Sequence, residues 1–195
     1  MKILAIGTSN NRHSINRTLA HYAAELVAGA EVEVIDIHDY EMPIFSDERE
    51  ERFGQPLQAR KLFRKISEAD GLVISFAEHN GSYTAAYKNL FDWVSRIDGR
   101  VFQDKPGVYL ATSPGAGGAK SVLESAVESA HFFGADLVGH MSIPKFHANF
   151  DQESGKLVNE GLRSQLARLM EELGRRMSGS ERLQAIAATA GFPFK

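Results

Sequence analysis

Five short apolar runs, mostly separated by segments with helical periodicity, constrain the fold of this chain more than any other feature of its sequence. The runs cover residues 3–6, 32–37, 72–76, 108–111 and 137–143. The first, third and fourth are almost continuously apolar, as expected for parallel strands that helices cover on both faces. The second alternates apolar and acidic residues, which is typical of a strand nearer the edge of a sheet.

Apolar residues at helical spacing predict five helices between and after these runs. The expected stripes lie within residues 15–27, 62–66, 87–97, 122–133 and 162–173, and Asn159 is placed to cap the last helix. Alternation of strands and helices over this length predicts a parallel sheet with right-handed crossovers. We therefore expect an α/β, flavodoxin-like three-layer sandwich with a five-stranded parallel sheet in the order 2-1-3-4-5. This domain is expected over residues 1–178, and residues 179–195 are expected to form a weakly structured C-terminal tail.

Charge and composition exclude several classes of protein. The 22 Lys and Arg residues against 25 Asp and Glu residues leave a net charge of −3. Without a polybasic block, nucleic-acid binding through phosphate contacts is not expected. The chain has no cysteine, which excludes disulfides, thiolate nucleophiles, iron–sulfur clusters and Cys-based zinc sites. The apolar runs are far shorter than the roughly 18 residues of a membrane span, and Met1 leads directly into the first run. We expect a cytoplasmic protein with no membrane partner.

Several familiar motifs are missing. The seven histidines include no pair at His-x-x-x-His spacing, so no metal site is expected. The stretch 113–121 looks like a Walker A loop, but the positions that need glycine before Lys120 are Pro114 and Ala119. Gly7 is the only glycine in the loop after the first strand, so the Rossmann dinucleotide fingerprint is absent as well. ATP, GTP and a Rossmann-bound nicotinamide are therefore rejected.

The loops after the first, third and fourth strands are the place for a ligand, because doubly wound sheets bind ligands at the carboxyl ends of their strands. The first of these loops, residues 7–16, concentrates hydroxyl and amide side chains and an arginine just before a helix. Such a helix N-terminus suits a phosphate group. The alternative interpretation is that Ser14 only caps the helix and the rest is a polar turn.

The other two loops favour a flat ligand. In residues 77–83, the pair Asn80-Gly81 predicts a turn with positive φ that exposes backbone groups to a polar ring. The alternative is an ordinary turn followed by a helix cap at Ser82. In residues 113–121, three glycines let a planar molecule approach the backbone closely.

Together, the three loops resemble the NADPH-dependent FMN reductase family, which includes chromate, quinone and azo-dye reductases. The resemblance covers roughly residues 1–176, and its most specific part is the block 78–93. It rests on Gly7-Thr-Ser with Ser14-Ile-Asn16-Arg17, on Glu78-His-Asn-Gly-Ser82 with Lys88-Asn89 and Asp92-Trp93, and on Ser113-Pro-Gly with Gly117-Gly118. The family usually has Pro-Glu-Tyr-Asn-Gly where Ala77 and His79 stand here.

The resemblance implies an FMN-dependent NAD(P)H oxidoreductase that reduces quinones, azo dyes, chromate or flavins by hydride transfer through flavin N5. FMN would be the bound cofactor and NADPH or NADH the transient co-substrate. No side chain is expected to act as a catalytic acid or base, because the cofactor carries the chemistry. The implied cofactor-binding residues are Thr8, Ser9, Arg12, Ser14, Ile15 and Asn16 at the phosphate, Glu78, His79, Asn80, Gly81 and Ser82 at the isoalloxazine edge, and Ser113, Pro114, Gly115, Gly117 and Gly118 on its other side.

Two other functions stay open, namely a flavodoxin-type electron carrier and a non-catalytic flavin-binding regulator. The net charge of −3 leans against the carrier, because such proteins dock through a far more negative surface.

Assembly is the last expectation from the sequence. The third and fourth helices carry more apolar residues than one sheet needs: Ala86, Phe91, Trp93, Leu123, Val127 and Phe132. We expect these two helices to form a homodimer, or a dimer of dimers, as members of the family do; the alternative is a wide stripe that faces the core.

Overall fold

The computed structural model describes the backbone of residues 1–189 and the side chains of residues 1–179. Five parallel strands form one sheet in the order β2-β1-β3-β6-β7. They are β1 (Lys2–Gly7), β2 (Glu31–Asp36), β3 (Gly71–Phe76), β6 (Pro106–Thr112) and β7 (Asp136–Ile143). Each predicted apolar run falls on one of these strands, except that Ile37 lies just after β2. Counted along the chain, the strand order is 2-1-3-4-5, so the flavodoxin-like prediction is confirmed.

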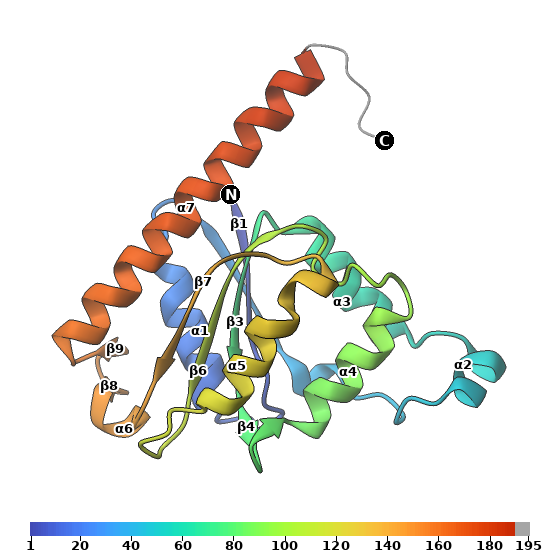
Figure 1. Cartoon of the computed structure of the whole chain (residues 1–195), viewed down its shortest axis with the longest axis horizontal. Helices are drawn as coiled ribbons and strands as arrows, with labels where there is room; N and C mark the ends of the chain where they lie inside the picture. Colours follow the sequence, from blue (N-terminus) through green and yellow to red (C-terminus); the bar gives the residue numbers. More distant parts are fainter. Residues whose placement is uncertain (190–195) are drawn as a thin grey trace.

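Helices cover both faces of the sheet (Figure 1). The helix α1 (Ile15–Glu25) and the first part of α7 (Glu160–Thr189) lie on one face. The helices α3 (Leu57–Glu68), α4 (Ala85–Ser95) and α5 (Lys120–Ser129) lie on the other. The shorter elements are η1 (Ile37–Tyr40), α2 (Asp47–Phe53), η2 (Ala130–Phe133), α6 (Phe146–Asn149), and two hairpins, β4 (Glu78–His79) with β5 (Ser82–Tyr83) and β8 (Phe150–Asp151) with β9 (Lys156–Leu157).

Strand β1 shows how the sequence divides the core into two layers. Its residues alternate between the faces, so Ile3 and Ala5 pack with α1 and α7, whereas Leu4 and Ile6 pack under α3 and α4. Strands β3 and β6 are buried along their whole length, whereas β2 is partly exposed. This difference follows from their positions, because β3 and β6 lie inside the sheet and β2 lies at its edge.

The last helix differs from the expectation for the C-terminal tail. Asn159 caps it as predicted, and its Oδ1 accepts a hydrogen bond from the Leu162 N–H at 3.1 Å. The expected boundary at residue 178 falls inside this helix, which continues to Thr189. Residues 190–195 lie outside the described part of the chain. No helix among the described residues is long and apolar enough to cross a membrane.

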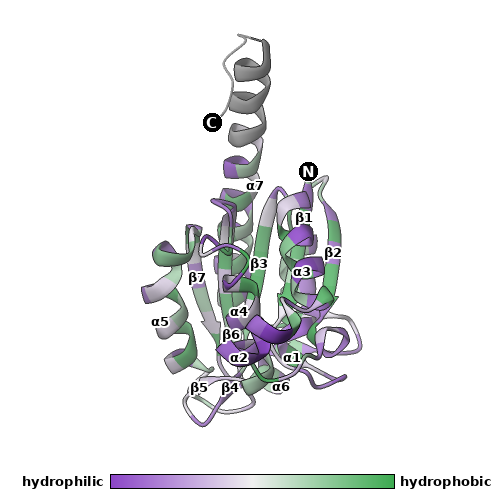
Figure 2. Ribbon diagram, turned by 90° about the vertical axis from the view of Figure 1, so that its right-hand side faces the viewer, coloured by the Kyte–Doolittle hydropathy of each residue, from purple (hydrophilic) through white to green (hydrophobic). Residues whose placement is uncertain are grey.

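One of the surplus apolar residues of α4, Trp93, is buried by a distant segment of the same chain. Trp93 is 1% exposed, and its indole N–H donates to the Pro43 carbonyl at 2.7 Å. Phe45 packs edge-on against the Trp93 ring. Leu123 of α5 is buried as well. At Trp93 and Leu123 the structure therefore supports the alternative to a dimer surface, namely a wide apolar stripe that faces the core. The acidic helix α2, which lies between η1 and α3, contributes no buried residue to the core and is hydrophilic along most of its length (Figure 2).

Candidate functional site

Three loops meet at the carboxyl end of the sheet, where the strand order reverses around β1 and β3. Gly7 at the end of β1 pairs with Ser75, and Phe76 at the end of β3 pairs with Ala111 in β6. The residues that follow each strand therefore start side by side. In doubly wound folds this place binds the ligand.

Thr8 ties the first loop to the second. Its hydroxyl accepts a hydrogen bond from the Ala77 N–H at 2.8 Å, and its carbonyl accepts one from the Thr84 hydroxyl at 2.6 Å. Thr84 also caps α4 by accepting from the Tyr87 N–H at 3.2 Å. Because Thr8 is fully buried, its side chain braces the loops and does not reach the surface where a phosphate would bind.

Asn16 has the same inward orientation. Its Nδ2 donates to the Thr112 carbonyl at 3.1 Å, and its Oδ1 accepts from the Thr112 N–H at 3.1 Å and from the Ser75 hydroxyl at 2.7 Å. The side chain is 3% exposed and joins α1 to the ends of β3 and β6. The side chains of Thr8 and Asn16, both expected at the phosphate, therefore already have protein partners. Both residues support the loops, and the Asn16 backbone N–H lies in the first turn of α1.

The start of α1 has the features of an anion site. Ser14 caps the helix by accepting from the Arg17 N–H at 3.1 Å, which leaves the N–H groups of Ile15 and Asn16 without an intrahelical partner. The Ser14 hydroxyl keeps its own proton for a ligand. The first turn lies directly on the end of β1, since a Cβ at Gly7 would overlap the backbone of Arg17.

Polar side chains surround this helix start. The Ser9 hydroxyl accepts from the Asn11 N–H at 3.2 Å, and the Arg12 guanidinium lies 2.9 Å from Nε2 of His38. Arg17, in the first turn of α1, pairs with Asp36. Among the described residues, no carboxylate pairs with Arg12. A helix N-terminus with hydroxyl donors and an arginine favours a phosphate group.

The second loop is a tight hairpin of β4 and β5. Asn80 and Gly81 form its turn with φ values of 53° and 76°, as the sequence predicts, and two consecutive positive φ values are typical of a type I′ turn. His79, Asn80, Gly81 and Ser82 are exposed. The alternative interpretation of this loop expected Ser82 to cap the following helix. Thr84 caps α4 instead.

The Glu78 side chain points away from the hairpin and toward α5. Its Oε2 accepts a hydrogen bond from the Val122 N–H at 3.0 Å. Ala119 precedes α5 with a left-handed φ of 58° and has no side chain that could cap it. Glu78 therefore caps α5 from a different loop, and its charge is favourable at a helix N-terminus. Because the Glu78 side chain is used in this cap, its backbone is the part available to an isoalloxazine ring. A backbone contact is also what the resemblance implies.

The third loop is held by a segment that the sequence analysis did not single out. The Lys145 N–H donates to the Gly115 carbonyl at 2.9 Å, and the Phe146 N–H donates to the Ser113 carbonyl at 3.0 Å. Behind them, the Ser142 hydroxyl donates to the Gly118 carbonyl at 2.8 Å. The topology could have indicated this segment, because the loop after β7 lies at the same edge of the sheet.

Two glycines of the third loop have different surroundings. Gly118 has a left-handed φ of 62°, and a Cβ there would overlap the Ser142 side chain. Gly117 is exposed, and a Cβ there would meet no described atom within 4 Å. Pro114 and Gly115 are exposed too, and Ser113 is half-buried. The segment 142–146 therefore fixes the loop on one side, and residues 114–117 are exposed on the other, which suits close contact with a flat ring.

Comparison with known proteins agrees with this geometry. The family model for NADPH-dependent FMN reductase matches residues 1–148. The chain belongs to this family. Membership confirms the implied enzyme class, an NAD(P)H oxidoreductase, with FMN as its cofactor and NADPH or NADH as co-substrate. The residues present fit FMN: the start of α1 suits its phosphate, and the exposed hairpin and glycine loop suit its flat ring.

Relatives support the assignment over most of the chain. A 2-hydroxy-1,4-benzoquinone reductase from a Burkholderia species is 32% identical over 182 residues, which are 88% of this chain and 93% of the relative. The NADH-dependent flavin reductase subunit 2 of Lactobacillus johnsonii is 32% identical over 174 residues, 82% of this chain and 88% of the relative. The structure of a flavoenzyme NAD(P)H:(acceptor) oxidoreductase from Paracoccus denitrificans superposes with a TM-score of 0.73 at 23% identity, covering 91% of this chain and 97% of the other. This FMN reductase shares its fold with that flavoenzyme.

Proposed function

We propose that this FMN reductase passes electrons from NAD(P)H to small quinones. The Burkholderia relative, which is named for a benzoquinone acceptor, aligns over nearly the whole of both chains. The observation that carries the proposal is the exposure of the hairpin and of the third loop, which would leave a flat acceptor access to a bound flavin. Azo dyes, chromate and free flavins are the other acceptors that the family resemblance implies.

We infer that residues of all three loops hold FMN. The hydroxyls of Ser9 and Ser14, the N–H groups of Ile15 and Asn16, and the Arg12 guanidinium would bind the phosphate. The backbone of residues 78–82 would meet one edge of the isoalloxazine ring, and that of residues 113–118 would lie on its other side. When bound, FMN supplies hydride and electron transfer between the nicotinamide and the acceptor.

The protein's own contribution is positioning. Hydrogen bonds join the three loops to one another and to the strand ends, through the side chains of Thr8, Asn16, Thr84 and Glu78. These bonds would hold the ligand-binding groups of the loops in place before FMN binds. Such preorganisation reduces the cost of ordering a site on binding. Nicotinamide and acceptor would use the same open face in turn, which requires no separate nicotinamide domain.

Assembly as a homodimer through α4 and α5 stays our prediction. It is supported by the side chain of Phe132, which is 72% exposed beside these helices, and by Phe91 and Val127, which are only partly buried. The burial of Trp93 and Leu123 within the chain removes two of the residues on which the sequence argument rested. A dimer of dimers and a cytoplasmic location are predictions in the same sense.

Steady-state oxidation of NADPH by the FMN-loaded chain tests the acceptor. We expect fast turnover with 1,4-benzoquinone, and slower turnover with an azo dye, chromate or free FMN. Turnover with free flavin but none with the quinone would contradict the proposal. An electron carrier would show no productive NADPH oxidation with any small acceptor, and a regulator would bind flavin without turnover.

A further inference from the structure

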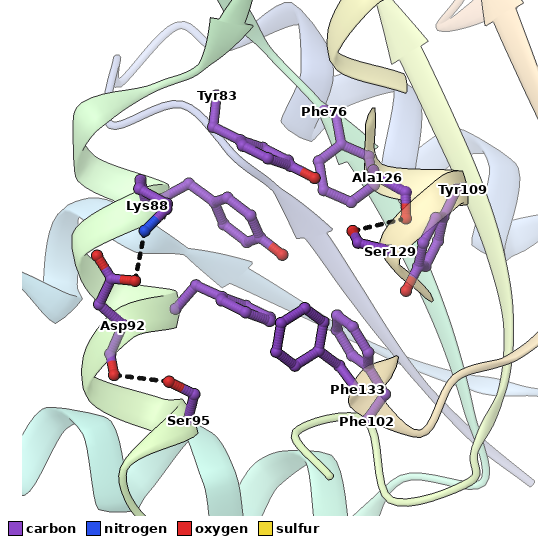
Figure 3. A pocket seen from close by; sticks show the side chains of 12 residues that line it. Phe76, Tyr83, Lys88, Asp92, Ser95, Phe102, Tyr109, Ala126, Ser129 and Phe133 are labelled. Atoms are coloured by element: carbon purple, nitrogen blue, oxygen red, sulfur yellow. Dashed lines mark hydrogen bonds and ion pairs between the residues drawn. The ribbon is translucent and has the colours of Figure 1, made fainter. Parts of the chain in front are cut away.

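A cavity of about 280 Å³ lies between α4 and α5, on the face of the sheet that these helices cover. Figure 3 shows Lys88, Asp92 and Ser95 on the α4 side and Ala126 and Ser129 on the α5 side. The cavity wall is formed largely by aromatic rings: Phe76, Tyr83, Tyr87, Phe102, Tyr109 and Phe133. Most of these rings meet edge to face, as between Phe76 and Tyr109 with centroids 5.1 Å apart. The inner part is therefore apolar, with phenol oxygens as its polar atoms.

One of these oxygens has no hydrogen-bond partner among the described residues. The Tyr109 side chain is 1% exposed, and its hydroxyl has no hydrogen-bond partner among the side chains and backbone that the structure describes. Leaving a buried hydroxyl unsatisfied is costly, and buried polar groups are almost always paired. Burial raises the pKa of the Tyr109 hydroxyl well above its usual value, so the group stays protonated and can donate. A partner from outside the chain would satisfy it.

Polar groups gather on the two helices that flank the cavity. The Lys88 ammonium pairs with the Asp92 carboxylate at 2.5 Å along α4, and the Ser129 hydroxyl donates to the Ser125 carbonyl at 2.9 Å on α5. The Lys88 side chain is exposed. Apolar walls with a few placed polar groups are typical of small-molecule sites.

We propose that this cavity binds a one-ring aromatic molecule that carries a hydroxyl group, a phenol, with the phenol oxygen hydrogen-bonded to the Tyr109 hydroxyl. An apolar cavity of about 150 Å³ already takes up benzene, so the larger volume here has space for a substituted ring. The aromatic wall matches the ring, and the unpartnered hydroxyl matches the oxygen. Apart from Tyr83 of β5 and Phe102 in the turn before β6, the lining comes from helices and the central sheet, so Tyr83 is the one lining residue that the cavity shares with the three loops. The proposal does not depend on the acceptor of the enzyme.

A second copy of the chain is the competing occupant. If α4 and α5 form the dimer contact, the exposed Phe132 ring of the partner could enter the cavity. A phenylalanine ring carries no oxygen, however, and would leave the Tyr109 hydroxyl unsatisfied. The phenol is therefore the occupant that the geometry favours.

Calorimetric titration of the FMN-saturated full chain with p-cresol and with toluene tests the proposal, because these probes differ only by the hydroxyl group. We expect p-cresol to bind more tightly than toluene. The variant Tyr109→Phe should bind p-cresol about three- to tenfold more weakly, as for loss of one neutral hydrogen bond, and should bind toluene as before. Tyr40→Phe, which removes the same atom from a half-buried tyrosine outside the cavity, is the matched control and should change neither affinity.

Two further variants locate the site and its competitor. Ala126→Leu narrows the cavity and should weaken both probes. Without ligand, Tyr109→Phe should melt at or above the temperature of the wild type, since it removes an unsatisfied group. The proposal is overturned if the wild type binds neither probe, if Tyr109→Phe keeps the preference for p-cresol, or if its melting temperature drops clearly. Binding that appears only in Phe132→Asp would show that a second copy fills the cavity, and would overturn it too.

Discussion

The Glu78 carboxylate accepts a hydrogen bond from the Val122 N–H at 3.0 Å, so the hairpin that follows β3 caps the helix that follows β6. This contact joins the hairpin to the end of the glycine loop, residues 113–118, because α5 begins where that loop ends. The conformation of the glycine loop therefore depends on the hairpin. The two loops act as one unit.

Replacing Glu78 should loosen this unit. We expect Glu78→Ala to lower the free energy of unfolding of the FMN-free protein by about 0.5–2 kcal/mol, the usual cost of a lost helix cap. FMN binding should weaken as well, since the third loop loses its anchor. Glu78→Gln keeps an acceptor oxygen and should recover most of both losses. Denaturant unfolding and flavin titration measure the two effects, and equal behaviour of the two variants would contradict the capping role.

Ser9 and Asn16 should separate ligand binding from folding. We expect Ser9→Ala to weaken FMN binding roughly tenfold or more, through loss of a hydrogen bond to a charged phosphate worth about 1.5–3 kcal/mol, with little change in stability. Asn16→Ala should instead destabilise the FMN-free fold by at least about 2 kcal/mol, because buried groups of Ser75 and Thr112 lose their partner. Denaturant midpoints without FMN and flavin titration give the comparison. If Ser9→Ala left the FMN affinity intact, the phosphate would bind elsewhere.

The glycine loop offers a matched pair of substitutions. Gly118→Ala should destabilise the protein by about 1–3 kcal/mol, since it adds a Cβ at a positive φ and against the Ser142 side chain. Gly117→Ala adds the same atom in open space and should leave the thermal stability of the FMN-free protein almost unchanged. Its effect should appear in FMN affinity alone. Comparable melting temperatures for the two variants would argue against the close packing at residue 118.

The Asp136–Arg176 ion pair should contribute to stability in a pH-dependent way. The hydrogen bonds from Arg176 lower the pKa of the Asp136 carboxyl in the folded state. A carboxyl with a depressed folded pKa stabilises the fold above its unfolded pKa of about 4, and this contribution is lost as the pH falls through the folded pKa. We expect Asp136→Asn to be less stable than the wild type at pH 7 and to approach it in strong acid. Urea unfolding across this pH range tests the sign, and a difference that grew in acid would contradict it.

The sequence predicted the fold because local signals agreed with the global arrangement. Continuous apolar runs gave the inner strands β3 and β6, and Asn80-Gly81 gave the positive-φ turn. Placing the ligand loops required only the strand order. These features depend on neighbours in the sequence or on the general rules of doubly wound sheets.

Side-chain direction in the loops could not be predicted in this way. A hydroxyl or amide in a polar loop can face a ligand or brace the fold, and the sequence alone does not distinguish the two. Asn16 faces inward because Ser75 and Thr112, 59 and 96 residues away, supply its partners. The helical pattern places Trp93 on a dimer surface, but in the fold the Pro43 carbonyl, 50 residues away, accepts a hydrogen bond from its indole N–H. Tertiary contacts decided both positions.

The mass of the protein in solution tests the predicted dimer. Light scattering of the FMN-loaded chain at micromolar concentration should give twice the 21.5 kDa of one chain, or four times for a dimer of dimers. A stable contact should bury at least about 1,000 Å², so Phe132→Asp, with a charge on the exposed ring position, should shift the equilibrium toward monomer. A wild-type mass of one chain would contradict the dimer.

Anaerobic mixing of the FMN-loaded chain with NADPH tests the account most directly, because it isolates the reduction of the bound flavin from the choice of acceptor. We predict that the visible absorbance of oxidised flavin disappears on mixing with NADPH, or with NADH, and returns when 1,4-benzoquinone is added. A chain that binds no FMN, or whose bound flavin keeps its absorbance in excess NADPH and NADH, would contradict the assignment of this site.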